Sequence, residues 1–168
     1  MAQHTRSISM NKAIIFFLLG MLITGCSIPS PKLNSDSDEA HASLVSFFEL
    51  LNAKEYNKAA SIYGGSYDGL QDSNPSVDPA DHAKLLENAC EINGNKCYLV
   101  RSATFMEAQG DTFIFQVEFN NPDGSLFVRG PCCGANETEM PPESQFEYKV
   151  KKTTNGKFLV MDLPIYVP

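Results

Sequence analysis

Cysteine is the residue type whose number and spacing say most about the chemistry of this chain. There are five, at Cys26, Cys90, Cys97, Cys132 and Cys133. A cysteine thiol can be modified, form a disulfide or bind a metal, depending on its surroundings. Cys26 lies three positions after the end of a hydrophobic segment, whereas the other four lie in mixed, polar sequence. We therefore expect Cys26 to serve a different purpose from the other four.

The N-terminus has the pattern of a secretory signal peptide. Arg6 and Lys12 provide positive charge, with no acidic residue before the apolar run over residues 13–23. At 11 residues, this run matches a signal-peptide core and is shorter than the ~20 residues that span a bilayer. The sequence predicts a signal peptide over residues 1–25, cleaved before Cys26. The alternatives are an ordinary signal peptide with an incidental cysteine and an uncleaved anchor.

The run Leu22-Ile23-Thr24-Gly25-Cys26 resembles the lipobox of bacterial lipoproteins. This resemblance implies that the Cys26 thiol carries diacylglycerol and that fatty acids such as palmitate hold the protein to a membrane. One acyl chain binds a membrane reversibly, and two or more give stable anchoring. We expect a lipoprotein on the exported side of a bacterial cell envelope, at the outer membrane or the outer face of the plasma membrane.

The other four cysteines predict disulfides, because exported proteins meet an oxidising environment. Four cysteines allow three pairings. In one, Cys90 and Cys97 close a short loop that contains an Asn-Gly turn, and Cys132 and Cys133 form a vicinal pair. In the others, Cys132 and Cys133 each bond to one of the first two. The sequence leaves the pairing open.

A zinc site and a redox-active pair are the two alternative uses of these cysteines. A zinc site does not match the spacing, because six residues separate Cys90 from Cys97, and Cys132 and Cys133 are adjacent. A redox-active vicinal pair is the second alternative, since strained disulfides are the more reducible ones. We expect no metal and no cofactor.

Carboxylates supply a second set of candidates. The segment between residues 66 and 81 holds oxygen ligands of the kind that calcium prefers, at Asp68, Asp72, Asn74, Asp78 and Asp81. It lacks the glycine and the terminal glutamate of an EF-hand. Turn formation and helix capping are therefore favoured over calcium binding.

Asp162 is the catalytic candidate. Alternation places it on an apolar strand face, where burial would raise its pKa and suit it to proton abstraction. The alternative is a solvated position near a strand end. His82 is expected to be exposed in the first turn of a helix, and Tyr98 and Tyr148 are expected in the core. No nucleophile, base and orienting group can be assembled from spacing, so an enzyme is the less favoured interpretation.

Composition excludes some partners. Cleavage would remove Arg6 and Lys12 and none of the 20 acidic residues, which changes the formal charge from −7 to −9. Nucleic-acid binding needs clustered Lys and Arg, so we expect no nucleic acid. An acidic domain also gains nothing from anionic lipid, so the lipid anchor has to provide the membrane attachment.

The pattern of apolar residues predicts helices first and strands afterwards. A polar segment, residues 26–40, is expected to be the lipidated N-terminus and a flexible tether. Helical stripes follow at Leu44, Val45, Phe47, Phe48 and Leu51, and then at Tyr56, Ala59, Ala60 and Tyr63. A third helix is expected to begin with Asp78 as N-cap and Pro79 at its first position.

From residue 97 onward the period changes to two. Alternating residues predict strands over residues 112–119 and 146–151, with further strands over 98–108, 125–129 and 157–163. Asn121-Pro122-Asp123-Gly124 and Asn155-Gly156 are turn signals between strands. Helices followed by an antiparallel meander predict an α+β domain with helices packed on one face of a curved sheet.

The pattern Phe-Phe-x-x-Leu-Asn (residues 47–52), then Tyr-Asn-Lys-Ala-Ala (residues 56–60) and a long sheet, resembles the NTF2-like (cystatin-like α+β) superfamily. It is similar in particular to small bacterial lipoproteins of that superfamily with no assigned function. The resemblance covers residues 41–168 and implies a conical domain with a cavity. That superfamily contains isomerases, dehydratases, transport factors and ligand binders, so the fold does not select an activity.

The expected function is a membrane-anchored, non-catalytic binding or accessory module of the envelope, whose ligand is a small molecule or an envelope protein. One alternative is a cavity enzyme, isomerase-like or dehydratase-like, that uses Asp162. The other is a structural lipoprotein that acts through protein interaction. An open apolar pocket containing Asp162 would favour the enzyme, and a filled interior would favour interaction.

Overall fold

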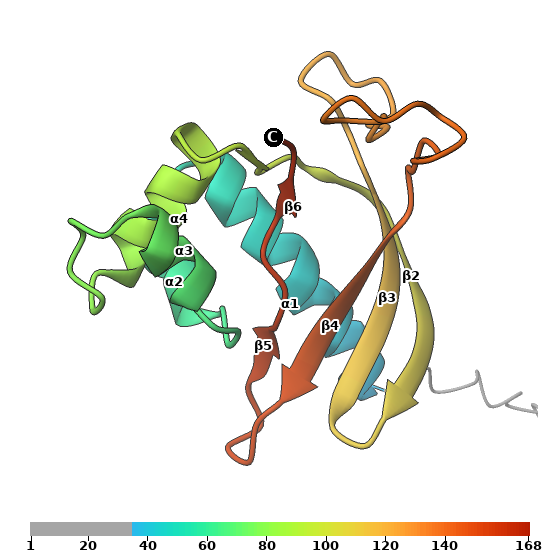
Figure 1. The fold of residues 1–168 in the computed structure, drawn as a ribbon. Helices are drawn as coiled ribbons and strands as arrows, with labels where there is room; N and C mark the ends of the chain where they lie inside the picture. The colour runs from blue at the N-terminus through green and yellow to red at the C-terminus, as the bar shows by residue number, and fades with distance from the viewer. Residues whose placement is uncertain (1–34) are drawn as a thin grey trace, which may run out of the picture. The chain divides into compact units, whose positions relative to one another are not determined.

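The computed structural model describes residues 35–168, so the predicted signal peptide, Cys26 and the tether up to residue 34 lie outside the described residues. Helices α1 to α4 come first in the chain and the strands of the main sheet follow, as Figure 1 shows. This order and the antiparallel pairing confirm the predicted α+β class. Within residues 35–168, no helix is both long enough and apolar enough to cross a membrane.

Helix α1 (Ser35–Asn52) carries the predicted apolar stripe. Its buried residues include Leu44, Phe47, Phe48 and Leu51. The helix begins earlier than predicted, because residues 35–40 are helical rather than part of a tether, and Ala40 is fully buried. Asp36 in the first turn suits the positive end of the helix dipole. Its Oδ2 also accepts a hydrogen bond from Lys152 Nζ at 2.7 Å, which fixes this end of the helix.

Three shorter helices follow: α2 (Tyr56–Ser61), α3 (Asp68–Ser73) and α4 (His82–Glu91). Helix α3 was not predicted, because its six residues are mostly polar and bury only Leu70. The prediction that Asp78 caps the next helix was wrong. Asp81 is the N-cap of α4, with Oδ1 accepting a hydrogen bond from Lys84 N at 3.0 Å. Asp78 closes a turn by accepting from Ala80 N at 2.9 Å.

The main sheet is antiparallel in the order β2 (Val100–Gln109), β3 (Thr112–Phe119), β4 (Phe146–Lys152) and β5 (Phe158–Val160). The predicted alternation holds, and the buried face carries Phe113, Phe115, Val117, Phe119, Phe146, Tyr148 and Val150. The strand expected over residues 125–129 is reduced to isolated bridges at Leu126 and Arg129. Strand β5 ends at Val160 rather than at residue 163.

A second, small sheet pairs β1 (Asn95–Lys96) with β6 (Ile165–Tyr166). Sequence periodicity could not predict it, because two residues do not establish a period. The pairing brings the C-terminal segment beside the end of α4, where Val167 N donates to Gly94 O at 3.1 Å. It therefore joins segments that are far apart in the sequence.

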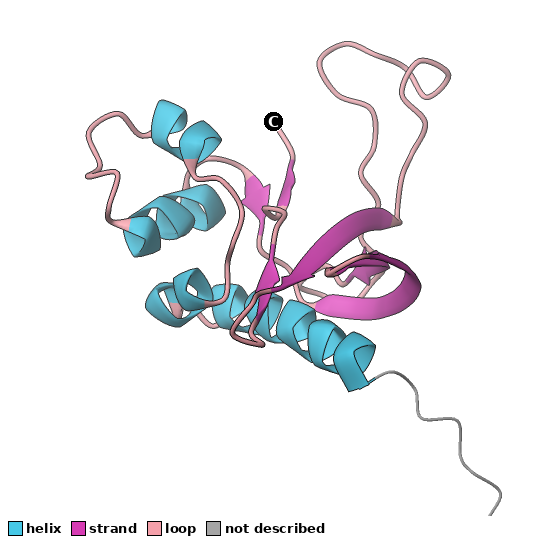
Figure 2. Cartoon of the chain, turned by 90° about the horizontal axis from the view of Figure 1, so that it is seen from below, coloured by secondary structure: helices cyan, strands magenta, loops and turns pink. Residues whose placement is uncertain are grey.

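The core lies between α1 and the sheet, which run alongside each other in Figures 1 and 2. Phe48 packs edge-on against Phe119 and Tyr148, with ring centroids 4.7 and 5.2 Å apart. The rings of Phe119 and Tyr148 contact each other at 5.7 Å. Phe47 stacks on Tyr63 at 5.7 Å on the side of the shorter helices. Aromatic rings thus fill the space between helix and sheet.

Candidate binding groove

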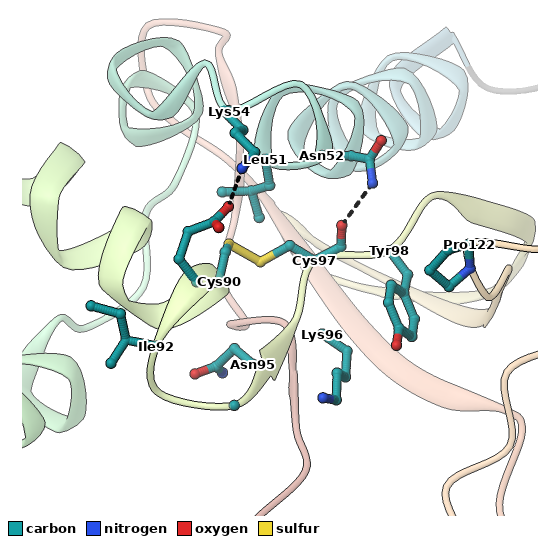
Figure 3. Close-up of a pocket in the computed structure, with 12 residues that line it drawn as sticks. Leu51, Asn52, Lys54, Cys90, Ile92, Asn95, Lys96, Cys97, Tyr98 and Pro122 are labelled. Atoms are coloured by element: carbon teal, nitrogen blue, oxygen red, sulfur yellow. Dashed lines mark hydrogen bonds and ion pairs between the residues drawn. A yellow bond between two sulfur atoms is a disulfide. The ribbon is translucent and has the colours of Figure 1, made fainter.

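An open groove lies at the corner where α4 leads into β1, beside the C-terminal end of α1 (Figure 3). Its volume is about 460 Å³. Its lining residues come from separate segments of the chain and are Leu51, Asn52, Lys54, Cys90, Glu91, Ile92, Gly94, Asn95, Lys96, Cys97, Tyr98 and Pro122. Only the folded chain brings them together.

A disulfide between Cys90 and Cys97 closes this corner, with Cα atoms 5.5 Å apart. The bond joins the last turn of α4 to the residue after β1. Gly94 turns the chain between them with φ +87°, and a Cβ there would lie 2.7 Å from Val167 O, so a side chain does not fit. The structure thus contains the pairing of Cys90 with Cys97, one of those that the sequence left open.

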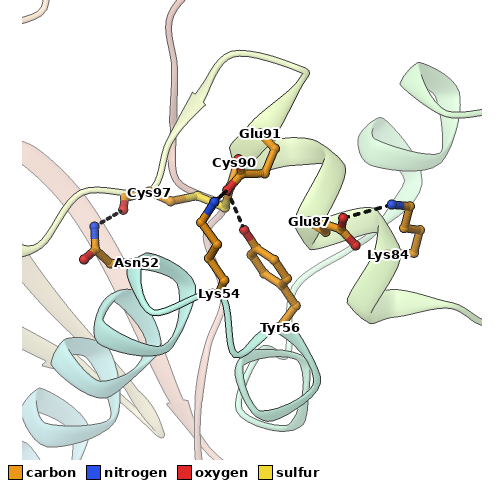
Figure 4. Close-up of polar contacts among 8 residues, drawn as sticks. All are labelled: Asn52, Lys54, Tyr56, Lys84, Glu87, Cys90, Glu91 and Cys97. Carbon is orange, nitrogen blue, oxygen red and sulfur yellow. Dashed lines mark hydrogen bonds and ion pairs between the residues drawn. A yellow bond between two sulfur atoms is a disulfide. The ribbon is translucent and has the colours of Figure 1, made fainter.

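Polar contacts tie α1, α2 and α4 together along the groove wall (Figure 4). Lys54 Nζ lies 3.0 Å from Glu91 Oε1, and Tyr56 OH donates to the same oxygen at 2.9 Å. These two donors lower the pKa of Glu91. Burial, and secondarily the bond to Glu91, raises the pKa of Tyr56 to about 12. On the other side of the disulfide, Asn52 Nδ2 donates to Cys97 O at 3.2 Å.

Three lining side chains remain available to a ligand. Ile92 is 72% exposed. Tyr98 is half-buried and packs edge-on against Phe127, with ring centroids 5.3 Å apart. Lys96 forms no ion pair among residues 35–168. An apolar side chain, an aromatic ring and an ammonium group at one concave surface are suited to binding.

Cys132 and Cys133 lie in the loop between Arg129 and Glu143, and both are free thiols with Sγ atoms 2.7 Å apart. The alternative in which they join this loop to the α4–β1 corner is wrong, because Cys90 and Cys97 are bonded to each other.

Asp162 lies beyond the end of β5, at a bend, and not on the strand face that alternation predicted. Its Oδ2 accepts a hydrogen bond from Lys149 N at 2.7 Å, so the carboxylate serves this β4 donor in place of a backbone carbonyl of a neighbouring strand. Burial raises the pKa of Asp162, against the effect of that hydrogen bond. The carboxylate is absent from the lining of the groove. Its visible role is to hold the turn after β5 against β4.

The acidic segment before α4 does not gather its oxygens around a common point. Within the described part of the chain, no group of three or more His, Cys, Asp or Glu residues could hold a metal ion. Asp68 begins α3, and Asp72 is exposed. Asn74 is buried, with Nδ2 donating to Leu70 O at 2.8 Å and Oδ1 accepting from Asn88 Nδ2 at 2.8 Å. These residues shape the connection between α3 and α4.

Two expectations about single residues are confirmed. His82 is exposed in the first turn of α4, where its ring stacks on Tyr67 at 3.9 Å. Tyr148 is in the core at 2% exposure. Tyr98, expected in the core, instead borders the groove.

Sequence reasoning did not single out Lys54, Tyr56 or Glu91. Tyr56 was interpreted as part of an apolar helix stripe, and the other two are charged residues of ordinary appearance. Lys54 takes a left-handed backbone with φ +61° at the turn after α1. No local sequence signal indicates that this turn brings its side chain to Glu91.

No protein-family model matches this chain, and no curated protein sequence matches it.

Proposed function

We propose that this chain is an exported lipoprotein, anchored through a lipid on Cys26 after removal of residues 1–25, whose α+β domain binds an envelope partner at its surface. The charged N-terminus, the short apolar core and the small residues before Cys26 support export and lipidation. The bond between Cys90 and Cys97 supports export separately, because disulfides persist mainly in oxidising compartments. The proposed location is the outer membrane or the outer face of the plasma membrane of a bacterium.

We also propose that the domain is a member of the NTF2-like group. Helices that precede a bent antiparallel sheet, with a long helix packed along one face, support this proposal. The NTF2-like resemblance implies a cavity between helix and sheet, and this is where a catalytic or ligand site would be expected.

The filled interior is the observation that carries the proposal of surface binding. Phe48 is fully buried and its ring contacts Phe119 and Tyr148, so aromatic side chains occupy the space between α1 and the sheet. Interiors packed in this way have few voids larger than a water molecule. A partner is therefore better accommodated outside the core.

The groove at the α4–β1 corner is the surface that we assign to the partner. Its wall is held by the disulfide and by the contacts of Glu91 with Lys54 and Tyr56, so little ordering is needed on binding. Lys96 supplies a positive charge and Ile92 an apolar contact. We assign to it a polypeptide segment that presents a carboxylate next to an apolar side chain.

Mass spectrometry of the mature protein tests the anchor. The expected N-terminal residue is Cys26 with a diacylglycerol modification, and Cys26→Ser should release the protein from the membrane fraction. An unmodified Cys26 or cleavage at another position would contradict the proposal.

Photo-crosslinking in the intact cell tests the groove. A photoreactive residue at Ile92 should form a protein adduct, and the same residue at exposed Lys151, on β4, should not. Lys96→Glu reverses the charge beside the groove and should lower the yield of the adduct at Ile92. Adducts at Lys151 with none at Ile92 would contradict the proposal and show that the partner binds at the sheet.

A further inference from the structure

Cys132 and Cys133 are brought together by a tight turn of the loop that precedes β4. Ala135 N donates to Cys132 O at 3.0 Å, which closes a four-residue turn. Its two central residues both have positive φ, +62° at Cys133 and +90° at Gly134, as in a type I′ turn. A cysteine rarely takes this conformation, and such outliers often mark functional positions.

The turn holds the two Sγ atoms 2.7 Å apart. Carbon atoms in van der Waals contact lie ~3.5–4.0 Å apart, and bonded sulfurs lie at about 2.05 Å. The two thiols are therefore close to bonding distance, and a small movement within the turn would join them.

The loop exposes this pair to solvent, and hydrogen bonds hold the two ends of the loop together. Arg129 and Glu143 exchange two backbone hydrogen bonds, Arg129 N to Glu143 O at 2.8 Å and Glu143 N to Arg129 O at 2.9 Å, and their side chains form an ion pair. The loop between β3 and β4 stands away from the sheet in both Figure 1 and Figure 2. Cys133 is exposed and Cys132 is partly so.

We propose that Cys132 and Cys133 form a two-electron thiol–disulfide site, which reduces a disulfide of a second molecule and closes to a vicinal disulfide in the process. This inference is independent of the partner proposed for the groove. The site is separate from the disulfide of Cys90 and Cys97, which has no free thiol to exchange.

The exchange occurs in two displacements. The Cys133 thiolate attacks one sulfur of the partner disulfide, forms a mixed disulfide and expels the other sulfur as a thiolate. The Cys132 thiolate then attacks Cys133 Sγ and expels the second partner sulfur. The protons that the two cysteines lose are taken up by the two released thiolates. The cysteines are oxidised by two electrons and the partner is reduced by two.

The two sulfurs have different roles. The two thiols share a hydrogen bond in which either sulfur can be the donor, and this contact with Cys133 raises the pKa of the Cys132 thiol. Cys133, with the greater exposure, is the attacking sulfur, and Cys132 is the resolving one.

Glutathione disulfide is the probe that tests the site on the purified full chain. Trypsin releases residues 130–149 as one peptide that contains both cysteines, whereas Cys90 and Cys97 fall on the separate peptides 85–96 and 97–101. After incubation with glutathione disulfide and alkylation, peptide 130–149 should be lighter than its reduced form by two hydrogens. It should carry neither glutathione nor alkyl groups.

Single variants separate the two steps. Cys132→Ser should keep one glutathione on Cys133, and Cys133→Ser should react more slowly. Gly134→Ala should accumulate the mixed disulfide, because alanine disfavours the positive φ that the turn requires. Gly130→Ala is the matched control. It lies in the same loop, and an added Cβ meets no atom within 4 Å at either glycine.

Three results would overturn the proposal. The first is a wild-type peptide 130–149 that retains two free thiols or two glutathiones. The second is a disulfide that links this peptide to 85–96 or 97–101. The third is a Gly134→Ala variant that closes the ring as fast as Gly130→Ala, which would show that the turn does not hold the sulfurs.

Discussion

Removal of the disulfide between Cys90 and Cys97 should destabilise the domain by a calculable amount. The two cysteines are separated by 7 positions in the sequence, so the bond closes a short loop in the unfolded chain. In the chain-entropy model, a loop of this length contributes about 2.5 kcal/mol at 25 °C. We expect the double variant Cys90→Ala/Cys97→Ala to lose this free energy of unfolding.

The loss should be visible in heat and denaturant unfolding. For a domain of this size, 2.5 kcal/mol corresponds to a decrease in melting temperature of roughly 5–12 °C. The mid-point of urea unfolding should fall in parallel. Dithiothreitol should bring the wild-type protein down to the level of the double variant and leave the variant itself unchanged.

The control is Cys132→Ser/Cys133→Ser, which removes one exposed and one partly exposed thiol and leaves the corner intact. It should unfold as the wild type does. If the Cys90→Ala/Cys97→Ala variant were as stable as the wild type under oxidising conditions, the bond would not be constraining the native protein. Equal losses in both double variants would show that the effect is not specific to the corner.

Three further predictions concern residues outside the disulfide. Asp162→Asn keeps an acceptor for Lys149 N but no charge. Because burial raises the carboxyl pKa, the wild type should lose stability relative to this variant as pH rises through that pKa. Asp162→Ala, without an acceptor, should cost about 1–3 kcal/mol. Urea unfolding at acidic and neutral pH measures both effects. A wild type that gains stability relative to Asp162→Asn between acidic and neutral pH would contradict the argument. Asp81→Ala removes the N-cap of α4 and should cost about 1 kcal/mol, whereas an unchanged urea mid-point would mean that the cap contributes nothing. Gly65→Ala would bring a Cβ against Met161 O, so its melting temperature should fall well below that of Gly69→Ala, whose Cβ has open space.

Much of the fold follows from periodic patterns that were readable before the structure. The stripe around Phe47 places α1 against the core, and the alternation around Phe115 gives β3 one buried face. The early end of β5 and the late start of α4 were not predictable to the residue, because both depend on tertiary contacts. Strand β5 ends where the Asp162 carboxylate accepts from the β4 donor Lys149 N. Helix α4 starts where Asp81 accepts from Lys84 N, whereas Asp78 accepts from Ala80 N and only closes a turn.

The site was less predictable than the fold. Cys90, Cys97, Cys132 and Cys133 were identified by residue type alone, and the sequence could not choose their pairing. The polar network at the groove was missed, since Lys54, Tyr56 and Glu91 come from different segments. Their meeting depends on the angle between α1, α2 and α4, which no short pattern encodes.

Composition and order along the chain by themselves determined that helices precede an antiparallel sheet, because hydrophobic periodicity is a local property of the sequence. They also led to the expectation of export and of a lipid on Cys26, which rests on a linear motif. Tertiary structure alone decided which cysteines are bonded, that aromatic rings fill the interior, and that a groove forms at the corner of α4 and β1. Each of these depends on distances between residues far apart in the sequence, and such distances are set by packing over the whole domain.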